Sequence, residues 1–230
     1  MGIEKRKIVV HEGPTAIIRN QYLDTVFRKN PLLTRLIGLS PLLAISYSLT
    51  LSLAMGIVFF IVFTLTSLLV SLSRYIIPPP AALACYVLIT ATIVTVIDLL
   101  MQTWYPDLRS ALGIYLPIVA ANCLIIDRIS VFASQSPIVS SLKDAVFHSL
   151  AVLLVLILLG SFRELIAYGS LMKDIHLLTG ETGKDLAFQL TQNEKGFSLA
   201  SLPAGAFIGL GLLIAAGNFL NTKLSSKPRR

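Results

Sequence analysis

The chain has 230 residues, of which 55% are hydrophobic and only 13% are charged, and its mean hydropathy is +0.79. Its 19 basic and 12 acidic side chains are too few to solvate a compact globule of 25.0 kDa, so the composition excludes a soluble protein and indicates a bilayer. Two Cys and three His exclude a four-Cys metal site or a disulfide framework in this chain alone. The net charge of +7 indicates loop orientation in a membrane protein, and we expect no nucleic-acid partner.

Stretches without charged residues predict the membrane spans, because a charge at the bilayer centre costs roughly 2.5–3.5 kcal/mol. The first stretch, residues 36–73, holds 38 residues, slightly fewer than the ~40 that two full spans require, so one of its two spans is expected to be short. Counting it as two predicts six spans, the others lying in residues 75–97, 110–126, 145–162 and 196–222. The first 35 residues are polar and basic, so we expect no secretory signal peptide before the first span.

The predicted organisation has three parts: an arm over residues 1–30, a six-helix membrane domain over residues 31–222, and a basic tail over residues 223–230. In the arm, Thr15 to Arg28 is consistent both with an interfacial helix and with an ordinary solvated segment. The membrane domain includes a periplasmic loop, residues 163–195, whose four basic and five acidic residues predict a small polar cap.

Lys and Arg are divided unequally between the two sides of a six-span arrangement. If both termini lie on one side, that side carries 14 of them and the other side carries 5. Because basic residues accumulate in cytoplasmic loops, both termini are predicted to be cytoplasmic.

The two halves of the chain contain matching features. Residues 37–44 (IGLSPLLA) and 112–120 (LGIYLPIVA) each have a Gly followed shortly by a Pro, and residues 71–76 match residues 160–165. Spans 1–3 and 4–6 are therefore predicted to be two copies of one three-helix unit, which an odd number of spans places in opposite orientations. A Pro inside a span breaks the helix, and a bilayer tolerates the break where it is buried in protein or lines a cavity.

The predicted fold is thus an all-α membrane protein, with six transmembrane helices as an inverted 3+3 repeat and with broken first and fourth helices. The two breaks are expected to meet near the membrane midplane. Two harmless kinks are the alternative interpretation.

The run of residues 112–123 (LGIYLPIVAANC) ends in Asn122-Cys123. It resembles the fourth-helix signature of the paired membrane subunits of the Rnf electron-transport complex and of Na⁺-translocating NADH:quinone reductase. Residues 160–171 (GSFRELIAYGSL) and 202–212 (LPAGAFIGLGL) add matches that are typical of the E-type subunits of Rnf. The resemblance extends roughly over residues 30–220 and includes three motifs in the right order on the expected spans.

This resemblance implies a subunit of an ion-transporting ferredoxin:NAD⁺ oxidoreductase, a translocase of the bacterial inner membrane that couples electron transfer to Na⁺ or H⁺ translocation. It implies a homologous six-helix A-type partner of opposite orientation, in an assembly with subunits of the B, C, D and G types. The pair would share one intramembrane [2Fe-2S] cluster, each holding half of it. Because the chain has no nucleotide or flavin motif, we expect a non-nucleotide-binding electron conduit that is not catalytic alone.

The rival interpretation is a small inverted-repeat solute transporter or channel without a redox role. A non-redox assembly subunit that kept the fold is a third.

Carried over by position, Cys123 is a cluster ligand, and thiolates are the usual ligands of such clusters. The second ligand position falls on Ser40, where the family reads Gly-Leu-Cys-Pro and this chain reads Gly38-Leu39-Ser40-Pro41. A serine oxygen can reach iron as an alkoxide, although it is a harder ligand than sulfur. Three outcomes follow from this substitution: the cluster is kept with Ser40 or another oxygen as a ligand, is kept with three Cys and an open position, or is lost. Since the flanking residues preserve the helix break, we expect the cluster to be retained.

Four further positions carry expectations. Asp98 interrupts the third span and is a candidate contact for the coupling ion, or it reaches the outer interface near Trp104. Cys85 matches no ligand position and is expected to be a small packing residue. Arg163 and Glu164 predict a structural ion pair at the membrane edge.

Overall fold

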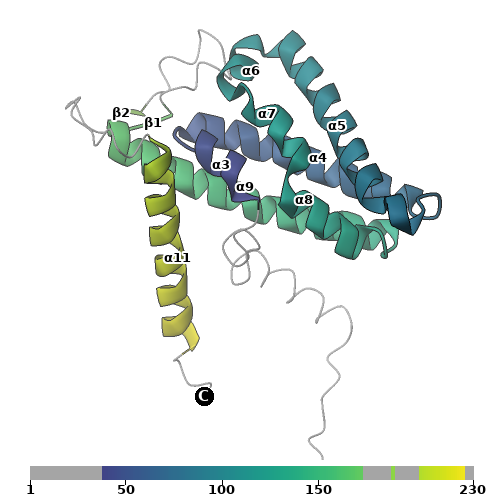
Figure 1. Ribbon diagram of the computed structural model, residues 1–230. Coiled ribbons are helices and arrows are strands. Elements are labelled where there is room, and N and C mark those ends of the chain that lie inside the picture. Colours follow the sequence, from purple (N-terminus) through teal and green to yellow (C-terminus); the bar gives the residue numbers. More distant parts are fainter. Residues whose placement is uncertain (1–37, 173–187, 190–201, 226–230) are drawn as a thin grey trace, which may run out of the picture.

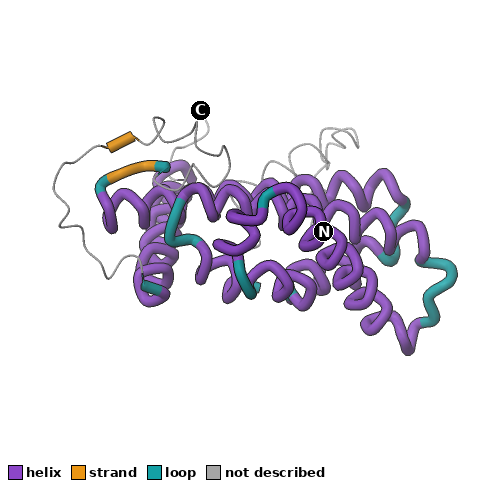
Figure 2. The backbone as a smooth tube through the Cα atoms, turned by 90° about the horizontal axis from the view of Figure 1, so that it is seen from above, coloured by secondary structure: helices purple, strands orange, loops and turns teal. Residues whose placement is uncertain are grey.

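The computed structural model describes residues 38–172, 188–189 and 202–225, so the arm with its predicted interfacial helix lies outside the described residues (Figure 1). In chain order the described elements are α3 (Leu39–Ile45), α4 (Leu49–Ser73), the 3₁₀ helix η1 (Pro79–Ala81), α5 (Ala82–Trp104), α6 (Pro106–Leu112), α7 (Tyr115–Ile118), the 3₁₀ helix η2 (Val119–Ala121), α8 (Cys123–Arg128), the π-helix η3 (Ile129–Ala133), α9 (Ile138–Tyr168), β1 (Ser170–Leu171), β2 (Phe188–Gln189) and α11 (Pro203–Ser225). Figure 2 shows that this part of the chain is almost wholly helical, apart from the short antiparallel pairing of β1 with β2.

The long helices α4 and α9 form the centre of the fold and run antiparallel. The backbone N–H of Leu49, at the start of α4, donates to Glu164 Oε2 near the end of α9, at 2.7 Å. At the other end of the pair, Ser141 Oγ near the start of α9 lies 3.4 Å from the carbonyl oxygen of Ser67. Contacts at both ends therefore fix the register of the two helices along their whole length.

Two glycines allow α4 and α9 to approach closely. A Cβ atom at Gly160 of α9 would overlap the side chain of Ser52, and one at Gly56 of α4 would lie 3.2 Å from Leu153 Cγ. Small residues at such positions let membrane helices pack backbone to backbone, where van der Waals contact replaces the hydrophobic driving force that lipid does not supply.

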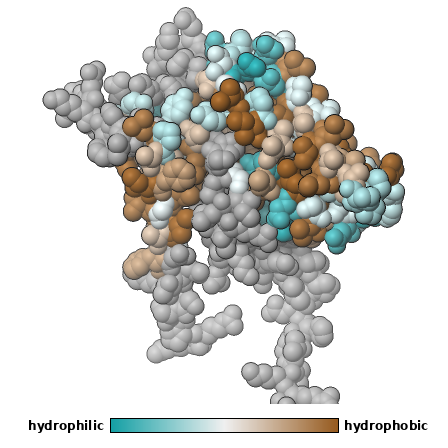
Figure 3. All heavy atoms as spheres, viewed as in Figure 1, coloured by the Kyte–Doolittle hydropathy of each residue, from teal (hydrophilic) through white to brown (hydrophobic). Residues whose placement is uncertain are grey.

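The remaining helices flank this pair on two sides. Helix α5 packs against α4 and against the segment of α7, η2 and α8, whereas α11 packs against α9 and α3. Large apolar side chains stay exposed on the outer faces of both flanking helices, including Leu88 and Leu99 on α5 and Phe207 and Leu212 on α11. Figure 3 shows apolar surface over both regions, as expected for faces that meet lipid or another membrane subunit.

Four helical segments of the described residues are long and apolar enough to cross a membrane: Leu49–Ser73, Pro79–Trp104, Tyr115–Ala133 and Ile138–Tyr168. These correspond to the predicted second, third, fourth and fifth spans. The first is represented by the seven residues of α3, and the apolar part of α11 is the shorter stretch Pro203–Gly217. The prediction of a helical membrane protein is confirmed, and the count of six spans stays a prediction.

The predicted limit at Arg74 is confirmed, because α4 ends at Ser73. The limits at Asp98, Asp144 and Arg163 were wrong, because each of these charged residues lies inside a helix. Helix α5 continues past Asp98 to Trp104, and the 31 residues of α9 include four charged residues near its two ends, Lys143, Asp144, Arg163 and Glu164. Asp98, Asp144, Arg163 and Glu164 each bind a group on another element. A paired charge costs much less than an isolated one, so it does not end a helix.

The fourth span is interrupted, but not at its proline. Pro117 lies in the first turn of α7, where a missing N–H removes no helical hydrogen bond. The interruption is at Asn122, whose extended backbone (φ −69°, ψ 117°) separates η2 from α8. The Gly-Pro match therefore marked the start of the fourth span rather than its break.

Candidate functional site

Cys123 is the first residue of α8 and follows the interruption in the fourth span directly. Its free thiol is exposed in this chain. Ser40, the other predicted ligand position, lies in the first turn of α3, where the structure describes only the backbone of this residue. Both predicted positions are thus within two residues of the start of a short helix.

The starts of α3 and α8 are in direct contact through Asn122. The Nδ2 group of Asn122 donates to the carbonyl oxygen of Gly38, 3.1 Å away and 84 positions earlier in the chain. Its Oδ1 atom accepts a hydrogen bond of 2.9 Å from the backbone N–H of Leu124 and so caps α8. The side chain is 3% exposed, so water does not compete for these bonds.

Gly38 has no side chain to obstruct this contact. Its φ of 73° lies in the left-handed region that favours glycine. A Cβ atom there would overlap Asn122 Oδ1 and come within 3.0 Å of Leu124 Cβ. The starts of α3 and α8 therefore meet at Gly38 and Asn122.

Within the described residues, no group of three or more His, Cys, Asp and Glu side chains is placed to hold a metal ion. Cys85 lies in the first turn of α5 as a free, half-buried cysteine. Among the described residues, the chain thus contributes one thiol, that of Cys123, to the place where the starts of α3 and α8 meet.

Asp98 lies on α5 and forms an ion pair with Arg109 of α6. Arg109 Nε donates to Asp98 Oδ1 at 3.0 Å, and its Nη2 donates to Oδ2 at 3.2 Å. The hydrogen bond to Asp98 raises the pKa of Arg109 above its ordinary value. The carboxylate is thus held by a cation from the next helix, and its contact with a coupling ion stays a prediction.

Arg163 is the largest fully buried side chain among the described residues, at 1% exposure. Its Nη1 atom donates to the carbonyl oxygen of Leu43 at 3.0 Å and to Ser46 Oγ at 2.7 Å, and Nη2 donates to the carbonyl oxygen of Leu202 at 3.0 Å. A cation near the last carbonyls of α3 complements the negative end of that helix. Arg163 thereby joins α9 to α3 and to the start of α11.

Glu164 is also fully buried, and its carboxylate binds the first N–H group of α4, that of Leu49. An anion at a helix N-terminus satisfies a backbone donor that has no partner within the helix. Arg163 and Glu164 thus hold the turn between α3 and α4 from both sides. Their predicted ion pair with each other stays a prediction.

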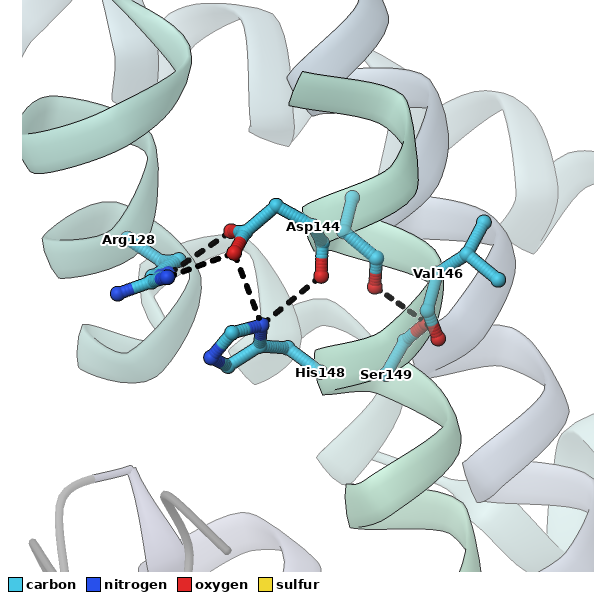
Figure 4. A network of polar contacts seen from close by, with 6 residues as sticks. Arg128, Asp144, Val146, His148 and Ser149 are labelled. Carbon is cyan, nitrogen blue, oxygen red and sulfur yellow. Dashed lines mark hydrogen bonds and ion pairs between the residues drawn. The ribbon is translucent and has the colours of Figure 1, made fainter. Parts of the chain in front are cut away.

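Sequence reasoning missed a second buried polar group, which joins α8 to α9 (Figure 4). Arg128 binds Asp144 with two hydrogen bonds of 2.8 and 2.6 Å, and His148 Nδ1 lies 2.8 Å from the carbonyl oxygen of Asp144. Asp144 and His148 are four residues apart and therefore share a helix face, a signal that was present in the sequence. The predicted start of the fifth span at residue 145 placed Asp144 in a loop, which concealed it.

The fold defines a multi-pass helical membrane protein in which the start of α3 meets the interruption in the fourth span, beside a central antiparallel pair. The family model described as "Rnf-Nqr subunit, membrane protein" matches residues 18–214. The chain belongs to this family.

Curated relatives match nearly the whole chain, and their printed names describe the E component of an ion-translocating oxidoreductase complex. The chain is 39% identical over 201 residues to this component from Thioalkalivibrio sulfidiphilus (strain HL-EbGR7), covering 87% of this chain and 88% of that protein. Proteins of the same name from Haemophilus ducreyi (strain 35000HP / ATCC 700724) and Pasteurella multocida (strain Pm70) are 38% and 35% identical. These matches cover 90% and 96% of this chain, and 92% and 99% of the relatives.

Proposed function

We propose that this chain is a membrane subunit of an Rnf-type complex that couples electron transfer from ferredoxin to NAD⁺ to the translocation of Na⁺ or H⁺. We further propose that it provides half of the site for an intramembrane [2Fe-2S] cluster and binds no nucleotide itself. Membership of the family and the printed name of the relatives support the membrane complex and its two coupled activities.

Cys123 is the observation that carries the proposal for the cluster. Its thiol is exposed although it lies within the apolar segment Tyr115–Ala133. In a bilayer such a thiol faces lipid or another protein rather than water, and a metal-binding group has little use against lipid. The residues present therefore fit one side of a site shared with a partner.

The small number of possible cluster ligands in this chain supports the need for that partner. A [2Fe-2S] cluster requires four ligands, and this chain offers Cys123 and position 40. Its described residues contain no group of three or more metal-binding side chains. The homologous A-type subunit would supply the remaining ligands. When bound, the cluster would supply a one-electron relay between carriers on the two faces of the membrane. Cys123 would hold it by a thiolate, and Ser40 through its oxygen.

The arrangement of the helices supports an inverted repeat. Contacts occur in matching pairs: α4 with α5 corresponds to α9 with α11, and α5 with the α7–α8 segment corresponds to α11 with α3. The ends of the central helices match as well. Arg163 of α9 binds Ser46 in the turn before α4, and Ser71 of α4 donates to the carbonyl oxygen of Ser136 in the turn before α9.

The same packing supports the proposed orientation. Arg74 follows the end of α4, and Arg128 binds Asp144 near the start of α9, so both lie at one end of the antiparallel pair. Arg163 lies at the opposite end, beside the turn before α4. The former end would face the cytoplasm together with both termini, in a bacterial inner membrane.

Visible absorption and EPR spectra of the purified complex test the proposal. We expect the unmodified complex to show an iron–sulfur signal from its membrane part. Cys123→Ala should abolish or severely alter this signal, and it should have the same effect on ferredoxin-to-NAD⁺ electron transfer. Cys85→Ala is the matched control and should leave both intact. Equal effects of the two replacements would refute the assignment of Cys123. A complex without any membrane cluster would refute the electron-conduit role and favour a transporter without redox chemistry.

A further inference from the structure

We propose that Asn122 is a positioning residue that holds the start of α3 against the start of α8 and so sets the distance between positions 40 and 123. We call its hydrogen bond to the carbonyl oxygen of Gly38 the tie. The consequence for a cluster rests on the proposed function. The tie itself is a property of this chain and can be measured without a cluster.

Both ends of the Asn122 amide are used, and they serve different helices. The oxygen caps α8 by accepting from the N–H of Leu124, and the nitrogen donates to the carbonyl oxygen of Gly38 at the start of α3. A side chain with an acceptor and a donor on one short planar group is needed for both bonds, which asparagine supplies. Serine and aspartate cap helices equally well but lack the nitrogen donor.

Gly38 forms the other side of the contact with Asn122, and its lack of a side chain makes the contact possible. Because any Cβ atom there would overlap Asn122 Oδ1, a side chain at position 38 would push the two breaks apart. The backbone of Gly38 is also in the left-handed conformation, which directs the chain into α3. Glycine and asparagine thus form one contact to which each residue is necessary.

The contact controls the relative position of the two predicted ligands. Ser40 lies two residues after Gly38 in α3, and Cys123 follows Asn122 directly in α8. Consecutive Cα atoms are about 3.8 Å apart, so neither position can move far from the contact without breaking it. Ligand sites depend on geometry held to about 0.5 Å by supporting residues, which is the function we assign to Asn122.

Three variants separate the tie from the cap. Asn122→Ser keeps an oxygen for the N–H of Leu124 and loses the bond to Gly38, whereas Asn122→Ala loses both. Ser134→Ala is the matched control. It removes a hydroxyl directly after the same interrupted span, which donates to the carbonyl oxygen of Ser130, and it leaves the contact of Asn122 with Gly38 untouched.

Disulfide trapping tests the tie in the full chain within membranes, with no partner expressed. The background carries Ser40→Cys and Cys85→Ala, so that oxidation with copper phenanthroline can join only the introduced thiol and Cys123 within one chain. We expect an intramolecular disulfide that forms at least fivefold more slowly after Asn122→Ser and at an unchanged rate after Ser134→Ala. An unchanged rate after Asn122→Ser, or no disulfide in the parent, would overturn the inference.

EPR spectra of the assembled complex test the consequence. Asn122→Ser should retain the membrane cluster but shift its g-values and reduction potential, whereas Ser134→Ala should leave them unchanged. A spectrum that changes in Asn122→Ala but not in Asn122→Ser would mean that the cap alone positions Cys123, which overturns the tie. If the unmodified complex holds no cluster, the proposed function fails, and the trapping experiment still decides the inference.

Discussion

Replacing the buried arginine tests how the fold is held together at the turn between α3 and α4. Arg163→Met keeps a long unbranched side chain but removes at least three hydrogen bonds, to the carbonyl oxygens of Leu43 and Leu202 and to Ser46 Oγ. Hydrogen bonds to charged groups contribute about 1.5–3 kcal/mol each. The gain from no longer burying a charge offsets part of the loss, so we expect a net destabilisation of about 3–5 kcal/mol.

The assay is the thermal unfolding midpoint of the purified complex in detergent. At about 2–4 °C per kcal/mol for a chain of this size, Arg163→Met should lower Tm by roughly 10 °C. Arg74→Met is the matched control, because among the described residues Arg74 contacts the neighbouring Tyr75 at the end of α4 and joins no two elements. A Tm for Arg163→Met within about 2 °C of the control would refute the reasoning.

Two further predictions concern position 40 and the topology. Ser40→Cys should produce a cluster signal closer to that of an all-cysteine site, and Ser40→Ala should weaken the cluster or shift its spectrum; an unchanged spectrum and potential in Ser40→Ala would show that the oxygen is not a ligand. With cysteines introduced one at a time by Asp185→Cys and Ser225→Cys in a chain without native cysteines, an impermeant thiol reagent added outside intact cells should modify position 185 and not position 225. Modification of position 225 and not of position 185 would show that the protein has the opposite orientation in the membrane.

Local composition was sufficient to predict the class of protein and the approximate place of four spans. A run of about twenty apolar residues is long enough to cross a bilayer whatever surrounds it, so α4 and α5 follow from the residues themselves. The predicted break at Gly38 to Pro41 coincides with the start of α3 at Leu39. Asn122-Cys123 was recognised as a motif, although its geometry was not foreseen.

Only the tertiary structure decided which polar residues meet. The bond from Asn122 to Gly38 joins residues 84 positions apart, and the bond from Arg163 to Leu43 joins residues 120 positions apart. Such contacts depend on how α4 and α9 pack, which local patterns do not specify. The same packing explains the error in the span limits. The sequence showed the charges of Asp98, Asp144 and Arg163 without their partners, and a charge without a visible partner was taken as the end of a span.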